Sequence, residues 1–254
     1  MNDAKANHGG RARKIMKIGA AALPLLSIAL VAAHYIWLGS GSNEWKLKEE
    51  RNGITIWTQK TPGNPLLKGR ALFRVHSTLG GIIKIVYDRD VHKANNMMKV
   101  TFLEAQHSPG YYGVFNTFTQ EMPGPFRPRQ FVLLSQHVQD PKTKAIELNA
   151  MAAPNKIPPS DCCVRLVHLH NRYTVTPRGD GNVDIEFFWD IDLGGAFPYA
   201  LQNAALPSAL YKAMNDFRDL VAKYDHDTVD YISEPGPAPL GDMNMTSVSL
   251  LAQP

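Results

Sequence analysis

The strongest constraint on the fold is the alternation of side chains in NVDIEFFWDID, residues 182–192. Apolar side chains occupy every second position from Val183 to Ile191, and acidic side chains fill most of the positions between them. Because successive side chains of a strand point to opposite faces, this pattern predicts a strand with one fully apolar face. A second layer of the protein must cover that face.

Similar alternation runs through most of the chain. In residues 67–76, Leu67, Ala71, Phe73 and Val75 alternate with basic residues. Further strand patterns occupy residues 53–60, 99–105, 111–120, 129–140, 144–151 and 164–177. These predicted strands are long and their connections are short, which favours an antiparallel, strongly curved meander.

A long helix is predicted over residues 197–224, where Pro198 and Pro207 both suit first-turn positions. Beyond Pro207 one helical stripe is apolar, formed by Leu210, Met214, Phe217 and Val221. Residues 79–96 are expected to form one or two short helices, capped by Ser77 or Thr78. The sequence therefore predicts an α+β fold in which a curved antiparallel sheet wraps around a long C-terminal helix.

The N-terminal region has the layout of a membrane-targeting segment. Residues 1–17 carry five basic residues against one acidic residue, and residues 18–38 contain no charged residue. Such a run meets the roughly 20 apolar residues needed to cross a bilayer. By the positive-inside rule, everything after Leu38 lies across the inner membrane, in the periplasm.

Two outcomes for this segment remain open. It is either an uncleaved signal anchor, with Tyr35 and Trp37 as interfacial aromatic residues, or a signal peptide with Val31 and Ala33 before a cleavage point. Cleavage would release the body into the periplasm. Residues 39–44 form a linker, 45–231 the folded body and 232–254 a flexible tail.

The net charge of +4 does not indicate a nucleic-acid-binding protein, because it belongs to the N-terminal tail. After residue 17 the chain balances 22 basic against 22 acidic residues. We expect a monomeric body with no nucleic-acid partner.

The only cysteines, Cys162 and Cys163, are adjacent in the sequence. Neighbouring cysteines can close only a strained ring, so no disulfide framework can hold the domain together. We expect two buried small side chains at the start of a strand.

The order and spacing of five segments resemble the START family of lipid-transfer domains, which have the helix-grip fold. These segments are residues 44–57, 66–78, 123–134, 164–177 and 190–221, and the resemblance spans about residues 45–231. It implies a sheet wrapped around the long helix, a tunnel between them that holds one lipid, and a gating loop near the helix.

Residues 123–131, PGPFRPRQF, resemble a Pro-x-x-Arg-Asp-Phe segment of that family. Gln130 stands where the family has the Asp. Prolines restrict backbone angles, so this segment is expected to form a rigid rim beside the tunnel. Arg127 and Arg129 would meet lipid headgroups or pair with carboxylates of the domain. The expected gate comprises Pro123, Pro125, Phe126, Arg127, Arg129, Gly194 and Gly195. The short helices around residues 82–87 are the alternative gate.

Sterol-binding relatives have a buried acid and a buried arginine where this chain has Asn116 and Ser135. With both charges replaced, the site could hydrogen-bond one hydroxyl or carbonyl of an otherwise apolar guest. The substitution weighs against carrying over the sterol preference. The ligand is expected to be a lipid or a sterol-like hydrophobic molecule, taken from a membrane. The expected lining is Phe73, Asn116, Phe131, Leu133, Ser135, Arg165, Ile185, Phe187, Trp189, Leu210, Met214 and Phe217.

Motifs for chemistry are weak. The sequence has no Gly-x-Ser-x-Gly, phosphate loop, dinucleotide fingerprint or zinc spacing. His168 and His170 lack further metal ligands at a telling spacing, and the acidic face of residues 186–192 is expected to be solvated outer surface. We therefore expect no catalytic residue, metal or cofactor. The alternatives are a cyclase- or hydrolase-like enzyme using His168 or Arg165, and a lipid-responsive sensor.

Overall fold

A computed structural model describes residues 24–88 and 97–236 of the chain, which form two units. The first contains residues 24–44 and 59–65, and the second contains the remaining described residues. Each unit is described by itself.

In the first unit, residues 24–39 are helical, and the end of this helix is held by residues 59–65. The indole of Trp37 donates to the carbonyl of Pro65 at 2.7 Å. The ammonium group of Lys60 donates to the carbonyls of Leu38 and Ser40 at 3.4 and 3.0 Å. A cation at a helix C-terminus is favoured by the helix dipole.

No helix within residues 24–88 and 97–236 is both long enough and apolar enough to cross a bilayer. The predicted membrane segment starts at residue 18, so part of it lies outside the described residues.

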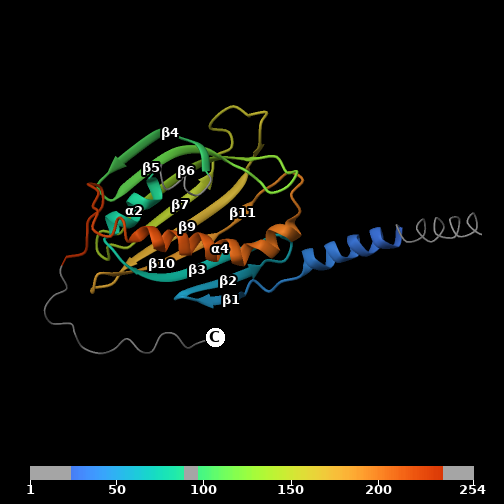
Figure 1. The fold of residues 1–254 in the computed structure, drawn as a ribbon, viewed down its shortest axis with the longest axis horizontal. Helices are drawn as coiled ribbons and strands as arrows, with labels where there is room; N and C mark the ends of the chain where they lie inside the picture. The colour runs from blue at the N-terminus through green and yellow to red at the C-terminus, as the bar shows by residue number, and fades with distance from the viewer. Residues whose placement is uncertain (1–23, 89–96, 237–254) are drawn as a thin grey trace, which may run out of the picture. The chain divides into compact units, whose positions relative to one another are not determined.

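The second unit is built on one curved antiparallel sheet with helices on one face (Figure 1). Its neighbouring strands follow the order β1-β2-β3-β10-β9-β7-β6-β5-β4, with β11 paired to β9 and the short β8 paired in parallel to β6. The strands are β1 (Trp45–Arg51), β2 (Ile54–Lys60), β3 (Leu67–His76), β4 (Met97–Ser108), β5 (Tyr111–Gln120), β6 (Arg129–Gln139), β7 (Ile146–Ala152), β8 (Val164–Arg165), β9 (His168–Pro177), β10 (Asn182–Trp189) and β11 (Ile191–Asp192). The predicted curved antiparallel sheet is confirmed.

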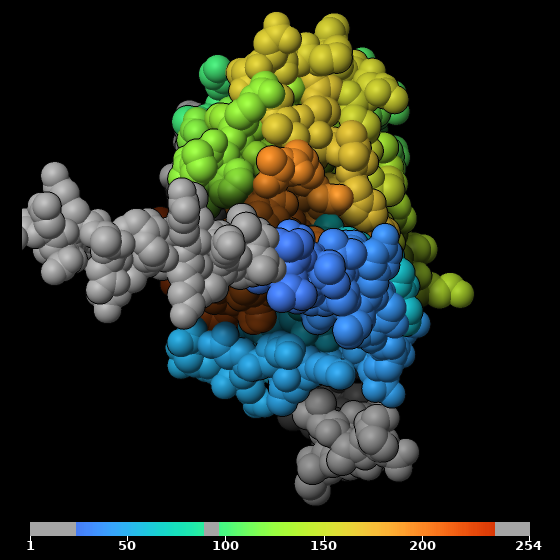
Figure 2. All heavy atoms as spheres, turned by 90° about the vertical axis from the view of Figure 1, so that its right-hand side faces the viewer, coloured from blue at the N-terminus to red at the C-terminus, as the bar shows by residue number. Residues whose placement is uncertain are grey.

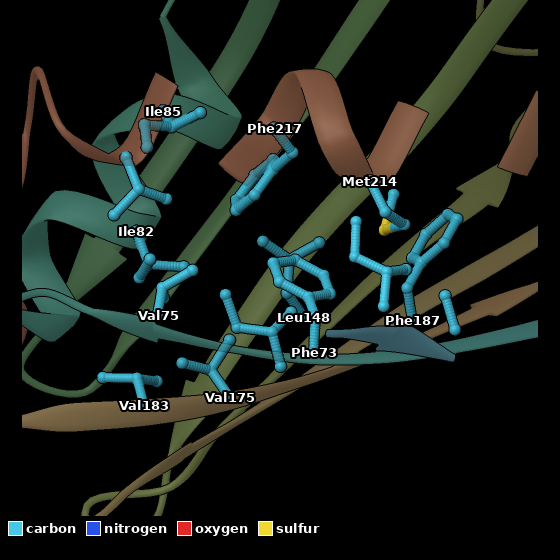
Figure 3. Close-up of a cluster of buried hydrophobic side chains, with 14 of the residues drawn as sticks. Phe73, Val75, Ile82, Ile85, Leu148, Val175, Val183, Phe187, Met214 and Phe217 are labelled. Atoms are coloured by element: carbon cyan, nitrogen blue, oxygen red, sulfur yellow. The ribbon is translucent and has the colours of Figure 1, made fainter. Parts of the chain in front are cut away.

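Helix α4 (Tyr199–Val221) lies across the sheet and covers one face, called here the inner face (Figure 1). Met214 and Phe217 point from α4 toward Phe73 and Phe187 of the sheet (Figure 3). Residues of β3 and β10 alternate between buried and partly exposed positions, as predicted. The register pairs Phe73 with Ile185, so both side chains lie on the inner face.

One expectation for the long helix is wrong. Pro207 lies inside α4, and Pro198 is the residue that precedes its first turn. The helix is continuous through Pro207, which removes one main-chain donor. The buried stripe of Leu206, Leu210, Met214 and Phe217 continues on both sides of it, so packing against the sheet outweighs the local preference.

Helix α2 (Leu79–Tyr87) is held by the segment that follows α4. Thr78 caps it, as predicted, and the carboxylate of Glu234 accepts bonds from the main-chain amides of Leu79 and Gly80 at 2.9 and 2.8 Å. A Cβ atom at Gly81 would lie 2.1 Å from the carbonyl oxygen of Tyr224. The packed body therefore includes Glu234, three residues beyond the expected boundary at 231. A second short helix would lie largely in residues 89–96, outside the described residues.

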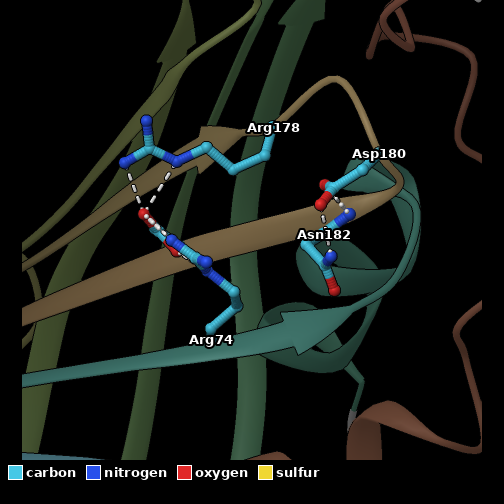
Figure 4. Close-up of polar contacts among 5 residues, drawn as sticks. Arg74, Arg178, Asp180 and Asn182 are labelled. Atoms are coloured by element: carbon cyan, nitrogen blue, oxygen red, sulfur yellow. Dashed lines mark hydrogen bonds and ion pairs between the residues drawn. The ribbon is translucent and has the colours of Figure 1, made fainter. Parts of the chain in front are cut away.

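The outer face of the sheet carries pairs of opposite charge. Asp184 of β10 accepts from Arg74 of β3 and from Arg178, and Asp180 holds Asn182 in the adjacent turn (Figure 4). Asp190 was expected on a solvated surface, yet it is buried between Lys68 at 3.1 Å and His168 at 2.9 Å. These carboxylates are engaged as ion-pair partners.

Candidate ligand-binding site

Two clusters of buried apolar side chains lie on the inner face. The α4 cluster joins α4 and α2 to β2, β3, β7, β9 and β10, and includes the predicted residues Phe73, Ile185, Phe187, Leu210, Met214 and Phe217. The rim cluster consists of Phe118, Phe131, Leu133, Leu166, Leu169 and Ile191. Trp189 packs against both clusters, so the inner-face orientation expected for it is present.

A row of residues, most of them small or polar, crosses the sheet between these clusters. Ser135 of β6 pairs with Ala150 of β7, and Ala150 pairs with Asn171 of β9. Farther along the strand order, Trp189 of β10 pairs with Gly69 of β3. We call Gly69, Trp189, Asn171, Ala150 and Ser135 the central row.

The central row is only partly covered. Ala150, Asn171 and Trp189 are half-buried, whereas Leu148 and Leu133, on the same face of the neighbouring strands, are buried. At Gly69, by contrast, α4 lies close to the sheet. A Cβ atom at this position would be only 2.9 Å from the side chain of Leu210. Helix α4 thus packs tightly against β3 and leaves surface accessible over β7 and β9.

Asn116 and Ser135, the predicted polar pair, are brought together and buried. The hydroxyl of Ser135 donates to the amide oxygen of Asn116 at 3.3 Å. The described residues provide no hydrogen bond to the amide nitrogen of Asn116. Two neutral side chains thus meet here, and the amide nitrogen of Asn116 remains available as a donor with respect to the described residues.

His137 was missed in the sequence analysis. It follows Ser135 by two positions on β6, pairs with Tyr112 and Leu148, and is fully buried on the inner face. Its Nδ1 lies 3.3 Å from the hydroxyl of Tyr87. Extending the alternation of Phe131, Leu133 and Ser135 by one step would have placed it inward.

Burial controls the protonation of this histidine. Removal from water lowers the pKa of His137 to about 4, because the charged imidazolium loses its solvation. Burial also raises the pKa of the neighbouring Tyr87. His137 is therefore neutral at physiological pH.

Arg129 ties the predicted rim to the segment that precedes α4. The side chain is 1% exposed and donates to the carbonyls of Leu193 at 2.7 Å, Gly194 at 2.8 Å and Arg127. Burial lowers its pKa. Neither expected role is present, since Arg129 is too buried to meet a headgroup and pairs with no carboxylate among the described residues.

The remaining rim residues surround this bond network. Figure 2 shows the segment before α4, in orange, between the green segment that contains residues 121–128 and the yellow loop near residue 155. Phe126 packs edge-on against Phe197 with ring centres 4.9 Å apart. Arg127 is exposed and donates to the carbonyl of Asp161. Pro123 and Pro125 are exposed.

Gly194 and Gly195 have φ angles of +63° and +61°, in the left-handed region that favours glycine. A Cβ atom at Gly195 would lie 3.3 Å from Val164. The pair permits the chain to turn tightly beside Arg129 and to enter α4.

Arg165 is the predicted lining residue that does not reach the inner face. It pairs in β8 with Gln130, and its guanidinium binds the side chain of Gln130 at 3.0 Å and the carbonyl of Pro158 at 2.7 Å. It also donates to the carbonyls of Pro154 and Ile157. Arg165 therefore holds the loop that precedes β8.

That loop contains the two cysteines, which are joined by a disulfide between neighbouring residues. Cys163 is buried, but Cys162 is exposed and its sulfur accepts a bond from Ser160 at 3.2 Å. The expectation of two buried small side chains holds for Cys163 and is wrong for Cys162.

His168 and His170 lie on the outer face and bind Asp190 and Asn149 at 2.9 and 3.2 Å. Within the described part of the chain no cluster of three metal-binding side chains occurs. The two histidines thus bind neighbouring side chains of the sheet.

Solved structures of similar fold were found, although no family model and no curated protein matches the sequence. The STAR-related lipid transfer protein fragment from Xanthomonas axonopodis is 19% identical, with a TM-score of 0.64 over 70% of this chain and 98% of that chain. The human StAR-related lipid transfer protein 5 is 17% identical, with a TM-score of 0.62 over 80% of this chain and 98% of that chain. This chain has the START helix-grip fold.

The lipid transfer and protein localization domain of human StarD13 shares the START fold at 15% identity and a TM-score of 0.61, over 71% of this chain and 90% of that chain. The fold expected from the ordered segments is thus confirmed. In this START fold the central row lies on the sheet face that α4 covers.

Proposed function

We propose that this chain binds one hydrophobic molecule, a lipid or sterol-like compound, between α4 and the central row. The observation that carries this proposal is the half-buried central row between two apolar clusters. A guest laid along the row would contact apolar side chains at both ends, and each buried CH₂ group contributes about 0.8 kcal/mol. Neighbours with the START fold are described as lipid transfer proteins, which supports the same reading.

The charges of the site favour binding over chemistry. Arg129 and Asp190 are the charged residues buried in the described part of the chain, and both are occupied by protein partners. His168 and Arg165, the candidates for an enzyme, are bound to groups away from the inner face. General acid-base chemistry needs a group that exchanges protons near the working pH, whereas burial lowers the pKa of His137, the ionisable side chain beside the central row, to about 4. We therefore propose a non-enzymatic binding protein that acts as a monomer without a cofactor.

Replacing Ala150 with tryptophan should block the proposed binding site. The indole would fill the space over the central row, so we expect Ala150→Trp to retain less than about a tenth of the copurifying lipid found with the full-length chain. Lipid would be identified and quantified by solvent extraction and mass spectrometry. Loss of copurified lipid with cooperative melting preserved would support the site.

The matched control is Val138→Trp, which adds the same ring at an exposed position on the opposite face of the neighbouring strand. This variant should carry as much lipid as the wild type. Undiminished lipid in a folded Ala150→Trp variant would remove the central row from the site.

We propose transfer of the intact lipid between membranes, with Pro123, Pro125 and the exposed Arg127 at the rim where it enters. Movement of unmodified lipid between donor and acceptor vesicles would support transfer. A recovered reaction product would favour the enzyme, and binding without exchange would favour a sensor.

We further propose that residues 18–38 direct the body to the periplasm and anchor it in the inner membrane. A reporter enzyme fused to the C-terminus should be active on the periplasmic side alone, because the basic tail stays in the cytoplasm. Intact mass and retention in salt-washed membranes would indicate an anchor, whereas a shorter soluble product would indicate cleavage. A cytoplasmic signal would contradict the proposed topology.

A further inference from the structure

One buried polar atom of the inner face has no partner among residues 24–88 and 97–236. Nε2 of His137 is fully buried, and the described residues supply no hydrogen bond to it. Most buried polar atoms are paired, and an unpaired one in a native structure calls for an explanation. A buried nitrogen that nothing binds loses its hydrogen bonds to water without replacement, which destabilises the fold.

The neighbours of His137 do not provide that partner. Tyr87 from α2 occupies Nδ1, and the rings of Tyr112 from β5 and Tyr231 from the C-terminal segment lie 5.8 and 5.5 Å from the imidazole, centre to centre. Ser135 lies two positions before His137 on β6, and its hydroxyl group donates a hydrogen bond to Asn116. His137 thus adjoins the central row, and its Nε2 is left without a partner by the part of the chain that the structure describes.

We propose that Nε2 of His137 hydrogen-bonds an uncharged polar group of the bound molecule. The site then selects a hydrophobic guest whose buried end carries a hydroxyl or carbonyl group. This inference rests on the proposed function and specifies its ligand class. His137 acts in it as a specificity-determining residue beside Asn116 and Ser135.

The protonation state supports a neutral partner. Burial keeps the pKa of His137 near 4, so the imidazole offers one donor and one acceptor and no charge. If Tyr87 donates to Nδ1, Nε2 carries the proton and donates to a hydroxyl or carbonyl oxygen. If Tyr87 accepts instead, Nε2 accepts from a hydroxyl. An alcohol satisfies either tautomer, which makes it the sharper probe.

The buried charged residues of the domain lead to the same ligand class. The guanidinium of Arg129 is used by three main-chain carbonyls, and Asp190 is used by Lys68 and His168. A phosphate or ammonium group buried beside His137 would find no counter-charge among these side chains, and burying an unpaired charge is very costly.

The test compares 1-dodecanol with dodecane as competitors for the uncharged fluorescent probe N-phenyl-1-naphthylamine on the full-length chain. One buried hydrogen bond should make the wild type prefer the alcohol by about tenfold. His137→Phe should lower that preference to within twofold of parity while it leaves the affinity for dodecane unchanged. His226→Phe, whose side chain is 89% exposed in the wild type, is the matched control and should keep the preference.

The outcomes separate the two proposals. Absence of probe binding by the wild type would overturn the proposed function. Probe binding with an alcohol preference that survives in His137→Phe would overturn the role of His137 alone.

If His137→Phe does not fold, histidine side-chain nitrogen spectra of the wild type decide the question. 1-Dodecanol should shift the Nε2 resonance of His137, assigned with His137→Gln, and dodecane should not. An unmoved resonance under saturating alcohol would likewise overturn the proposal.

Discussion

Replacing Arg129 with methionine should destabilise the protein by about 3 kcal/mol, because the buried guanidinium donates to three main-chain carbonyls. Methionine fills much of the same volume but donates to none of them, so the carbonyls of Leu193, Gly194 and Arg127 would lose their partner. The measurement is the shift of the urea midpoint at constant slope.

Arg127→Met provides the comparison, since Arg127 is exposed and donates to one carbonyl, that of Asp161. We expect a loss below about 1 kcal/mol there. Equal losses in the two variants would show that Arg129 does not hold the rim. Because these bonds join the rim to the entrance of α4, the folded Arg129→Met variant should also exchange lipid faster.

Acidification from pH 7 to pH 5 should remove about 2 kcal/mol of stability through His137. Its pKa is about 4 in the folded state, against 6.5 for a histidine in water. Between these two values, His137 binds a proton in the unfolded chain but not in the folded chain. Stability is present in full above pH 6.5 and is lost progressively as the pH falls toward 4.

Urea unfolding at several pH values would measure this loss, and His137→Phe should flatten the curve between pH 7 and pH 5. The rings facing His137 do not titrate in that range, since the pKa values of Tyr87, Tyr112 and Tyr231 are raised by burial. Asp184, whose pKa is lowered by its bond to Arg74, acts at lower pH. An unchanged slope in His137→Phe would mean that another group carries the acid sensitivity.

The sheet was predictable because its signal is local. Alternation places Val183, Ile185 and Phe187 on one face whatever their partners are, and the structure keeps that face. The pairing of Asn116 with Ser135 came instead from the resemblance to START relatives, and the structure brings the two side chains within hydrogen-bond distance. Side-chain direction in a strand depends on the residue's own position in the alternation.

Hydrogen-bond partners were less predictable, because they depend on residues far away in the sequence. Arg129 binds carbonyls 64 and 65 positions later, and nothing in the rim segment signals them. Arg165 looked suited to a lining role by residue type alone, yet its strand is two residues long and faces a loop. Pro207 lies inside α4 and not in a first turn, because the packing of the helix against the sheet outweighs the local preference of proline.

The bond between Glu234 and the first turn of α2 joins residues 155 positions apart. Helix α2 is made early on the ribosome, but the carboxylate that completes its first turn is among the last described parts of the chain to be synthesised. The pairing of β3 with β10 likewise waits for residues near 185. Contacts of such separation slow folding. The domain must therefore stay open, with its apolar inner face unprotected, until nearly all of it has been translated.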